Sequence, residues 1–230
     1  MKKLYLTEEE YIAIAEYGKK GKSKMKAILI SIRPQWVELI LDLIKKTETR
    51  KGAAIGKAVN KLIEEQGFAP MFIYCTNQSP WIDWNKGVAK LNNGRGCVRS
   101  YKSLRNINGK VVACFYAIAE EIEKIPYTAG SHVYRTSLLG IDGLSKTSCL
   151  SLQELDDYLK GKNGTAIHIC DLKIFDEPKA LSEFYKVGHY EDINDYFTDE
   201  KRIDGKWCIP LKKAPQNYCY VEVEEELLDY

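Results

Sequence analysis

The sequence lacks the features that would assign it to a broad class at once. None of its apolar runs approaches the ~20 residues of a membrane-spanning helix, so no membrane association is expected. Its 34 Lys and Arg residues are balanced by 32 Asp and Glu residues, and the net charge is only +2. Bulk charge therefore does not mark a nucleic-acid-binding protein, and any such role requires a local cationic patch.

Clustered metal ligands are also missing. The seven cysteines include no CxxC pair, and the three histidines (His132, His168 and His189) lie far apart in the sequence. Neither a zinc site nor another cofactor is predicted. The first residues are basic but turn acidic at once, unlike a signal peptide. We therefore expect a cytoplasmic protein with reduced cysteines.

What the sequence does contain is a substantial apolar fraction, 45% of its residues, in short runs. Runs rich in β-branched and aromatic residues predict buried strands over residues 27–32, 71–75, 111–118, 166–175 and 218–223. Apolar residues at helical spacing predict helices over 34–45 and 56–66, and a capping box starting at Ser151 predicts a third. The segment 130–148 is predicted to be a loop.

Several short strands with few helices predict the α+β class, with the strands forming a small mixed or antiparallel β-barrel and helices flanking it. Residues 1–25 are expected to form an N-terminal helical extension. Residues 26–230 are expected to form one domain with long insertions at about 76–110 and 186–210.

A polar strand is predicted immediately after the first helix, over Thr47-Glu48-Thr49-Arg50-Lys51. Alternation places Lys46, Glu48 and Arg50 on one face and the two threonines on the other. A strand without apolar residues does not build a core. It either lines a wet cationic cleft, where arginine binds phosphate in two places, or forms a solvated edge in which Glu48 and Arg50 neutralise each other.

Polar residues elsewhere give further candidates, each with a structural alternative. Arg33, at the start of the first helix, either binds an anion with the helix N-terminus or lies on the surface. His168 lies within a predicted strand, where a hydrogen-bonded structural histidine is the simpler interpretation. Gln216 and Asn217 either bind a base edge through their amides or cap the turn into the last strand.

The insertion at 76–110 interleaves cations with aromatic residues, and Asp83 is its only acidic residue. This pattern suits stacked bases and phosphates, but it also fits a solvated loop whose tryptophans cover the core. The candidate nucleic-acid-binding residues in it are Trp81, Trp84, Arg95 and Arg99.

Three stretches together resemble the ASCH family of the PUA-like superfamily. They are Ile28 to Lys51 (ILISIRPQWVELILDLIKKTETRK), Ala166 to Phe184 (AIHICDLKIFDEPKALSEF) and Lys213 to Glu222 (KAPQNYCYVE). The first resembles the family's Gly-x-Lys-x-x-x-x-Arg signature. Lys45 and Arg50 match its last two positions, whereas Leu43 replaces the glycine.

The resemblance implies a small barrel with a cleft beside the signature strand, in a protein type common in bacterial and phage-like genomes. It implies RNA binding with a regulatory role, or hydrolysis of acetylated cytidine or of RNA. The amidohydrolase members use a lysine, a threonine three residues later and a distant glutamate. Lys45 matches the lysine, but Glu48 replaces the threonine. The glutamate is one of three candidates: Glu120, Glu121 and Glu123.

The first functional hypothesis is therefore a binding protein for RNA or a nucleotide-like ligand. Its cleft would contain Lys45, Lys46, Glu48, Arg50 and Lys51. The alternative is a hydrolase in which Lys45 and Glu48 are catalytic. A protein-interaction domain is the third class left open, and the oligomeric state is not predicted.

Overall fold

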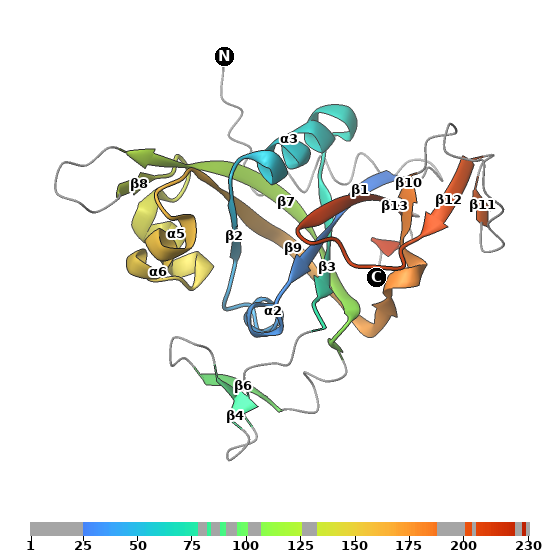
Figure 1. The fold of residues 1–230 in the computed structure, drawn as a ribbon, viewed down its shortest axis with the longest axis horizontal. Coiled ribbons are helices and arrows are strands. Elements are labelled where there is room, and N and C mark those ends of the chain that lie inside the picture. Colours follow the sequence, from blue (N-terminus) through green and yellow to red (C-terminus); the bar gives the residue numbers. More distant parts are fainter. Residues whose placement is uncertain are drawn as a thin grey trace. The chain divides into compact units, whose positions relative to one another are not determined.

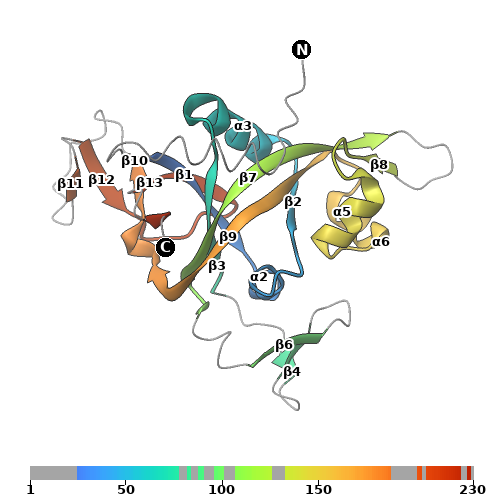
Figure 2. The same cartoon turned by 180° about the vertical axis from the view of Figure 1, so that it is seen from behind.

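The structure is a computed structural model, and it describes residues 25–77, 82–83, 88–90, 96–100, 107–125, 133–187, 201–203, 206–223 and 227–228. Within these residues the chain forms two compact units. The first unit contains Leu39–Ala69 and Tyr116–Asp171, and the second contains the described parts of Lys20–Glu38, Pro70–Phe115 and Leu172–Tyr230. Figures 1 and 2 show the elements from opposite sides.

The first unit combines strands with most of the described helices. Its strands are β2 (Thr47–Lys51), β8 (Val133–Arg135), the later part of β7 (Lys110–Ile125) and the first part of β9 (Gly164–Ala180). Its helices are α3 (Ala54–Gln66), α5 (Gly140–Ser148), α6 (Leu152–Leu159) and the end of α2 (Pro34–Leu41). Strand β2 pairs antiparallel with β9, and β8 pairs antiparallel with β7.

Apolar side chains of α5, α6 and three strands form the core of this part of the first unit. Leu144 from α5 and Leu155 and Leu159 from α6 pack with residues of β7, β8 and β9, namely Ile122, Tyr134 and Ala166. The capping box predicted at Ser151 is confirmed: the Ser151 hydroxyl accepts from the Glu154 amide, and the Glu154 carboxylate accepts from the Ser151 amide. In both views α5 and α6 lie side by side (Figures 1 and 2).

The second unit is built on β1 (Met25–Ile32), which pairs in parallel with β3 (Pro70–Cys75) and antiparallel with β13 (Tyr218–Val223). The remaining elements are β4 (Ile82–Asp83), β5 (Val88–Lys90), β6 (Gly96–Ser100), η1 (Leu181–Glu183), β10 (Tyr185–Val187), β11 (Lys201–Ile203) and β12 (Lys206–Pro210). Phe72, Phe175 and Phe184 pack against one another in the core of this unit.

The α+β class and the five predicted strands are confirmed, but the closed barrel is not. In the second unit the strand order is β11-β12-β10-β13-β1-β3-β7, which is an open mixed sheet. In the first unit the order ends at β2, whose described pairing is with β9 alone. The polar strand β2 is therefore an edge strand: within the part of the chain that the structure describes, one of its sides has no neighbouring strand.

Two helix predictions need correction. Helix α2 ends at Leu41 rather than at residue 45, and the predicted loop at 130–148 contains α5. The N-terminal extension lies outside the described residues, and the insertion at 76–110 contains three short strands, β4 to β6. None of the described helices is both long enough and apolar enough to cross a membrane.

Candidate functional site

The candidate site lies in the first unit, where α2 ends and β2 begins. The chain leaves α2 through a tight turn in which the amides of Ile44 and Lys45 both donate to the Leu39 carbonyl, at 2.9 Å each. Leu43 in this turn adopts φ +59°, in the left-handed region that suits glycine. The turn directs the Lys45 side chain inward, whereas Leu43 and Ile44 are exposed.

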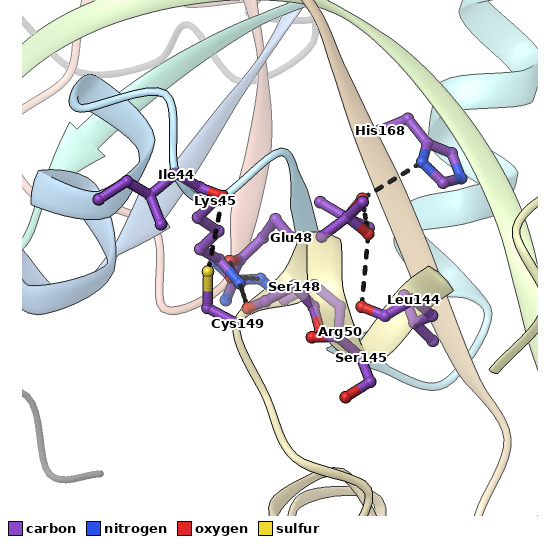
Figure 3. A network of polar contacts seen from close by, with 11 residues as sticks. Ile44, Lys45, Glu48, Arg50, Leu144, Ser145, Ser148, Cys149 and His168 are labelled. Carbon is purple, nitrogen blue, oxygen red and sulfur yellow. Dashed lines mark hydrogen bonds and ion pairs between the residues drawn. The ribbon is translucent and has the colours of Figure 1, made fainter. Parts of the chain in front are cut away.

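Lys45 is a buried lysine whose ammonium contacts oxygen atoms of Ser148 and Glu48. Only 3% of its surface is exposed to solvent. The ammonium donates to the Ser148 carbonyl at 2.7 Å and lies 3.3 Å from Glu48 Oε2. Ser148 is the last residue of α5, so its carbonyl lies at the negative end of that helix and favours a cation. Figure 3 shows Lys45 between Glu48 and Ser148.

Glu48 joins Lys45 to Arg50. Its Oε1 atom lies 3.1 Å from Arg50 Nε, and both side chains are largely buried. Glu48 and Arg50 are two residues apart on β2, so alternation predicts the shared face that the structure shows. The cluster therefore contains two cations and one carboxylate in surroundings that exclude most water, where charges interact more strongly than on a surface.

Burial lowers the pKa of the Lys45 ammonium below its ordinary value of 10.5, and the nearby Glu48 carboxylate only partly offsets this effect. Removing an ammonium from water disfavours its charged form, whereas an adjacent carboxylate favours it. Lys45 is thus closer to releasing its proton than a surface lysine is. That property suits a general base or a nucleophile.

The opposite face of β2 carries a second polar cluster. Thr47 pairs with His168 across β2 and β9, and its hydroxyl lies 3.3 Å from His168 Nδ1. His168 Nε2 lies 2.9 Å from Glu120 Oε1. The prediction that His168 is hydrogen-bonded is confirmed. Of the three candidate glutamates, Glu120 is buried, whereas Glu121 and Glu123 are exposed.

The other predicted site residues are not part of these clusters. Lys46 and Lys51 are exposed at the two ends of β2, and Lys51 Nζ lies 4.9 Å from the centre of the Tyr158 ring. Arg33 is exposed in the second unit at the start of α2. Gln216 and Asn217 also belong to the second unit, where the Asn217 carbonyl accepts from the Ser31 amide. This backbone contact does not test whether the two amide side chains bind a base edge or cap the turn.

The aromatic and cationic residues of the insertion remain untested. Trp81, Trp84 and Arg95 lie outside the described residues, and Arg99 lies in β6, for which only the backbone is described. No described group of His, Cys, Asp and Glu side chains has the arrangement of a metal site. The cysteines whose side chains are described form no disulfide bonds; they are Cys75, Cys114, Cys149, Cys170 and Cys219. Burial raises the pKa of the Cys75 thiol to about 12.

Sequence reasoning missed two partners of the site. The Ser148 carbonyl is a backbone group in a segment predicted to be a loop, so no side-chain pattern indicated it. The hydroxyl of Thr147, which contacts Thr47 at 2.9 Å, lies in the same segment. Both depend on how α5 packs against β2, and the sequence offers no sign of that packing.

Comparison with protein-family models gives no match for the chain. A search of curated proteins likewise gives no significant match.

The turn before Lys45 gives a direct test of local strain. We expect Leu43→Gly to raise the free energy of unfolding by about 0.5 kcal/mol. A left-handed conformation costs a non-glycine residue roughly 1–2 kcal/mol, and glycine's extra chain entropy offsets part of the gain. Leu43 is 63% exposed, so little packing is lost. Urea unfolding followed by circular dichroism measures the change.

Ile44→Gly is the matched control, because Ile44 is also exposed but does not have a positive φ. It is expected to destabilise by about 1 kcal/mol, since glycine then brings only its entropic cost. Equal losses in the two variants would contradict strain at Leu43.

Proposed function

We propose that this chain is an RNA- or nucleotide-binding protein of the ASCH type, and that it binds phosphate along the edge strand β2. The observation that carries the proposal is the Lys45–Glu48–Arg50 cluster, in which one carboxylate contacts two largely buried cations. Cations in a poorly hydrated site interact strongly with an anionic ligand, and the arginine fork suits phosphate oxygens.

The surroundings of the cluster support the same ligand class. The exposed residues Lys46 and Lys51 at the ends of β2 add cations on either side of Arg50. Strand β2 is the last strand of the sheet order in the first unit, and it becomes more exposed toward Arg50 and Lys51. Phosphate contacts of this kind do not specify a base sequence.

The binding test uses the exposed lysines, because replacing them leaves the buried cluster intact. We expect Lys46→Ala/Lys51→Ala to weaken binding of single-stranded RNA roughly tenfold at low salt. The slope of log affinity against log salt should fall by about 1 to 2, since each phosphate contact releases about one counterion. Fluorescence anisotropy with a labelled oligonucleotide, at several salt concentrations, measures both quantities.

Lys57→Ala/Lys61→Ala is the matched control, because it removes the same charge from exposed positions of α3. It should leave both the affinity and the salt slope nearly unchanged. If both double variants weaken binding equally, only net charge matters and β2 is not the binding surface. If the parent chain does not bind RNA even at low salt, the proposal fails.

A hydrolase is the second candidate, and the lowered pKa of Lys45 favours it. A lysine that deprotonates readily beside a carboxylate provides acid–base chemistry. Against the amidohydrolase of the family stands Glu48, which occupies the position of the family's threonine. Incubation with acetylated cytidine, with Lys45→Met as the control, distinguishes the two candidates. Turnover that depends on Lys45 would favour the hydrolase, whereas salt-sensitive binding without turnover would favour the binding protein.

A further inference from the structure

Two series of polar contacts, here called chains of contacts, start at His168, one from each ring nitrogen. Nε2 contacts Glu120 Oε1 at 2.9 Å, and Nδ1 contacts Thr47 Oγ1 at 3.3 Å. The His168 side chain is 15% exposed, and that of Glu120 is 3% exposed. Such a pair forms a buried ion pair when the imidazole is protonated.

Both chains of contacts continue to helix α5. On the first, Glu120 Oε2 accepts from the Leu138 amide at 2.8 Å and from the Ser137 hydroxyl at 3.5 Å, immediately before the helix. On the second, Thr47 Oγ1 contacts Thr147 Oγ1 at 2.9 Å in the last turn. His168 is thus linked to the approach to α5 and to its carboxyl end. The same end supplies the Ser148 carbonyl that binds Lys45.

The protonation state of His168 determines how many hydrogen bonds the second series of contacts can form, because each threonine hydroxyl has only one hydrogen to donate. When both ring nitrogens carry protons, Nδ1 donates to Thr47, Thr47 donates to Thr147, and Thr147 donates to the Gly143 carbonyl at 3.0 Å. When Nδ1 is deprotonated, Thr47 must donate to it. Thr147 must then turn toward Thr47, and its bond to Gly143 is lost. The charged imidazole therefore supports one more hydrogen bond in this chain.

The imidazole is in contact with a buried carboxylate. Burial raises the pKa of the Glu120 carboxyl, but hydrogen bonds from His168 and the Leu138 amide outweigh it, so the pKa is lowered and the carboxylate stays ionised. Glu120 is the titratable side chain that the structure describes in contact with the ring. Charged residues near the ring in sequence or on paired strands include the exposed Lys46, Glu121, Asp142, Lys146 and Asp171. Lys45, Glu48 and Arg50 are ion-paired with one another.

We propose that His168 is a positioning residue for the Lys45 site: its protonated imidazole, through Glu120 and Thr47, holds the last turn of α5 against Lys45. Loss of the imidazole proton loosens that turn and exposes the Lys45 amine. Leu144 anchors the middle of α5 in the core, so the movement is confined to residues 147–149. If the movement controls access of a ligand to Lys45, the inference rests on the proposed function. The exposure of Lys45 itself can be measured without any ligand.

In the experiment the folded protein is treated with a small amine-reactive ester that acetylates lysines. Digestion and mass spectrometry then give the rate of acetylation of Lys45 relative to that of the exposed Lys46. We expect the Lys45/Lys46 ratio to rise about fivefold in Thr147→Val, because one buried hydrogen bond to the last turn is lost. Thr147→Ser, which keeps the hydroxyl, should restore the parent ratio.

The pH dependence separates positioning by His168 from a purely structural role. In the parent chain the ratio should rise severalfold between pH 5 and pH 8, the range in which imidazoles titrate. His168→Gln should have a high ratio that does not change over this range. An unchanged ratio in Thr147→Val, or a pH-dependent rise that persists in His168→Gln, would overturn the inference. Because no RNA is added, failure of the RNA-binding proposal would leave this result unaffected.

Discussion

Glu48→Gln should lower the free energy of unfolding by about 3 kcal/mol at pH 7, because it leaves two largely buried cations without their carboxylate. The amide keeps the shape of the side chain, so the loss reports on charge rather than on packing. Chemical denaturation followed by circular dichroism measures it. A loss below 1 kcal/mol would show that the cluster is effectively solvated.

Glu65→Gln provides the matched control. Glu65 lies 3.6 Å from Lys61 in a much more exposed ion pair on α3, and such pairs contribute at most about 0.5 kcal/mol. The same chemical change is thus made in two environments. Similar losses in the two variants would contradict the importance of burial.

The deficit of Glu48→Gln should also shrink as pH rises. Burial already lowers the pKa of Lys45, and loss of Glu48 removes the attraction that opposes this effect. A lysine whose pKa is lower in the folded than in the unfolded state releases its proton on folding, so stability increases with pH. The neutral amine no longer needs a carboxylate. The difference between variant and parent should therefore be smaller at pH 9 than at pH 7.

Gly164→Ala should destabilise the first unit by roughly 2–3 kcal/mol, through steric conflict rather than charge. A Cβ atom at Gly164 would lie 2.8 Å from the Arg50 carbonyl oxygen and 2.7 Å from Leu159 Cδ2. The Leu159 methyl group has some freedom to move, but the Arg50 carbonyl belongs to β2, which pairs with β9 at this position. Relief of the conflict therefore requires displacement of the strand that carries the candidate site.

Gly140→Ala separates this conflict from the general cost of replacing glycine. Gly140 has φ +65°, but no atom lies within 4 Å of an added Cβ. Its replacement should cost only the left-handed strain, roughly 1–2 kcal/mol. RNA binding by the two variants gives a second measurement, since only Gly164→Ala alters β2. Equal effects on stability and on binding would argue against the close approach of the two strands.

The predicted strands were correct where burial on both faces gives a continuous apolar run. Such runs at β1 and β3 have few alternative structures in a chain of this size. The polar strand β2 was predicted from alternation alone, and this alternation also placed Glu48 and Arg50 on a common face. These parts of the fold depend on local patterns, which a single sequence contains in full.

The features that sequence reasoning missed depend on contacts between distant segments. Helix α5 has glycine, serine and threonine at many positions, which are weak helix formers, and its carboxyl end is held by donors from Lys45 and Lys46. Helix α2 ends early because Leu43 adopts a conformation that usually requires glycine. The barrel prediction failed because strand order at the sheet edges has no local sequence signal.

The absence of apolar residues from β2 has a consequence for how the chain folds. A shift of one residue along β9 would normally be prevented because it would turn apolar side chains to the solvent. In β2 such a shift exchanges one polar face for another, so the hydrophobic effect does not select the pairing. Selection falls to the ion pairs of Glu48, the contact between Thr47 and His168 and the close approach at Gly164. These act only at short range, so β2 should join its neighbour late, after the apolar strands have assembled.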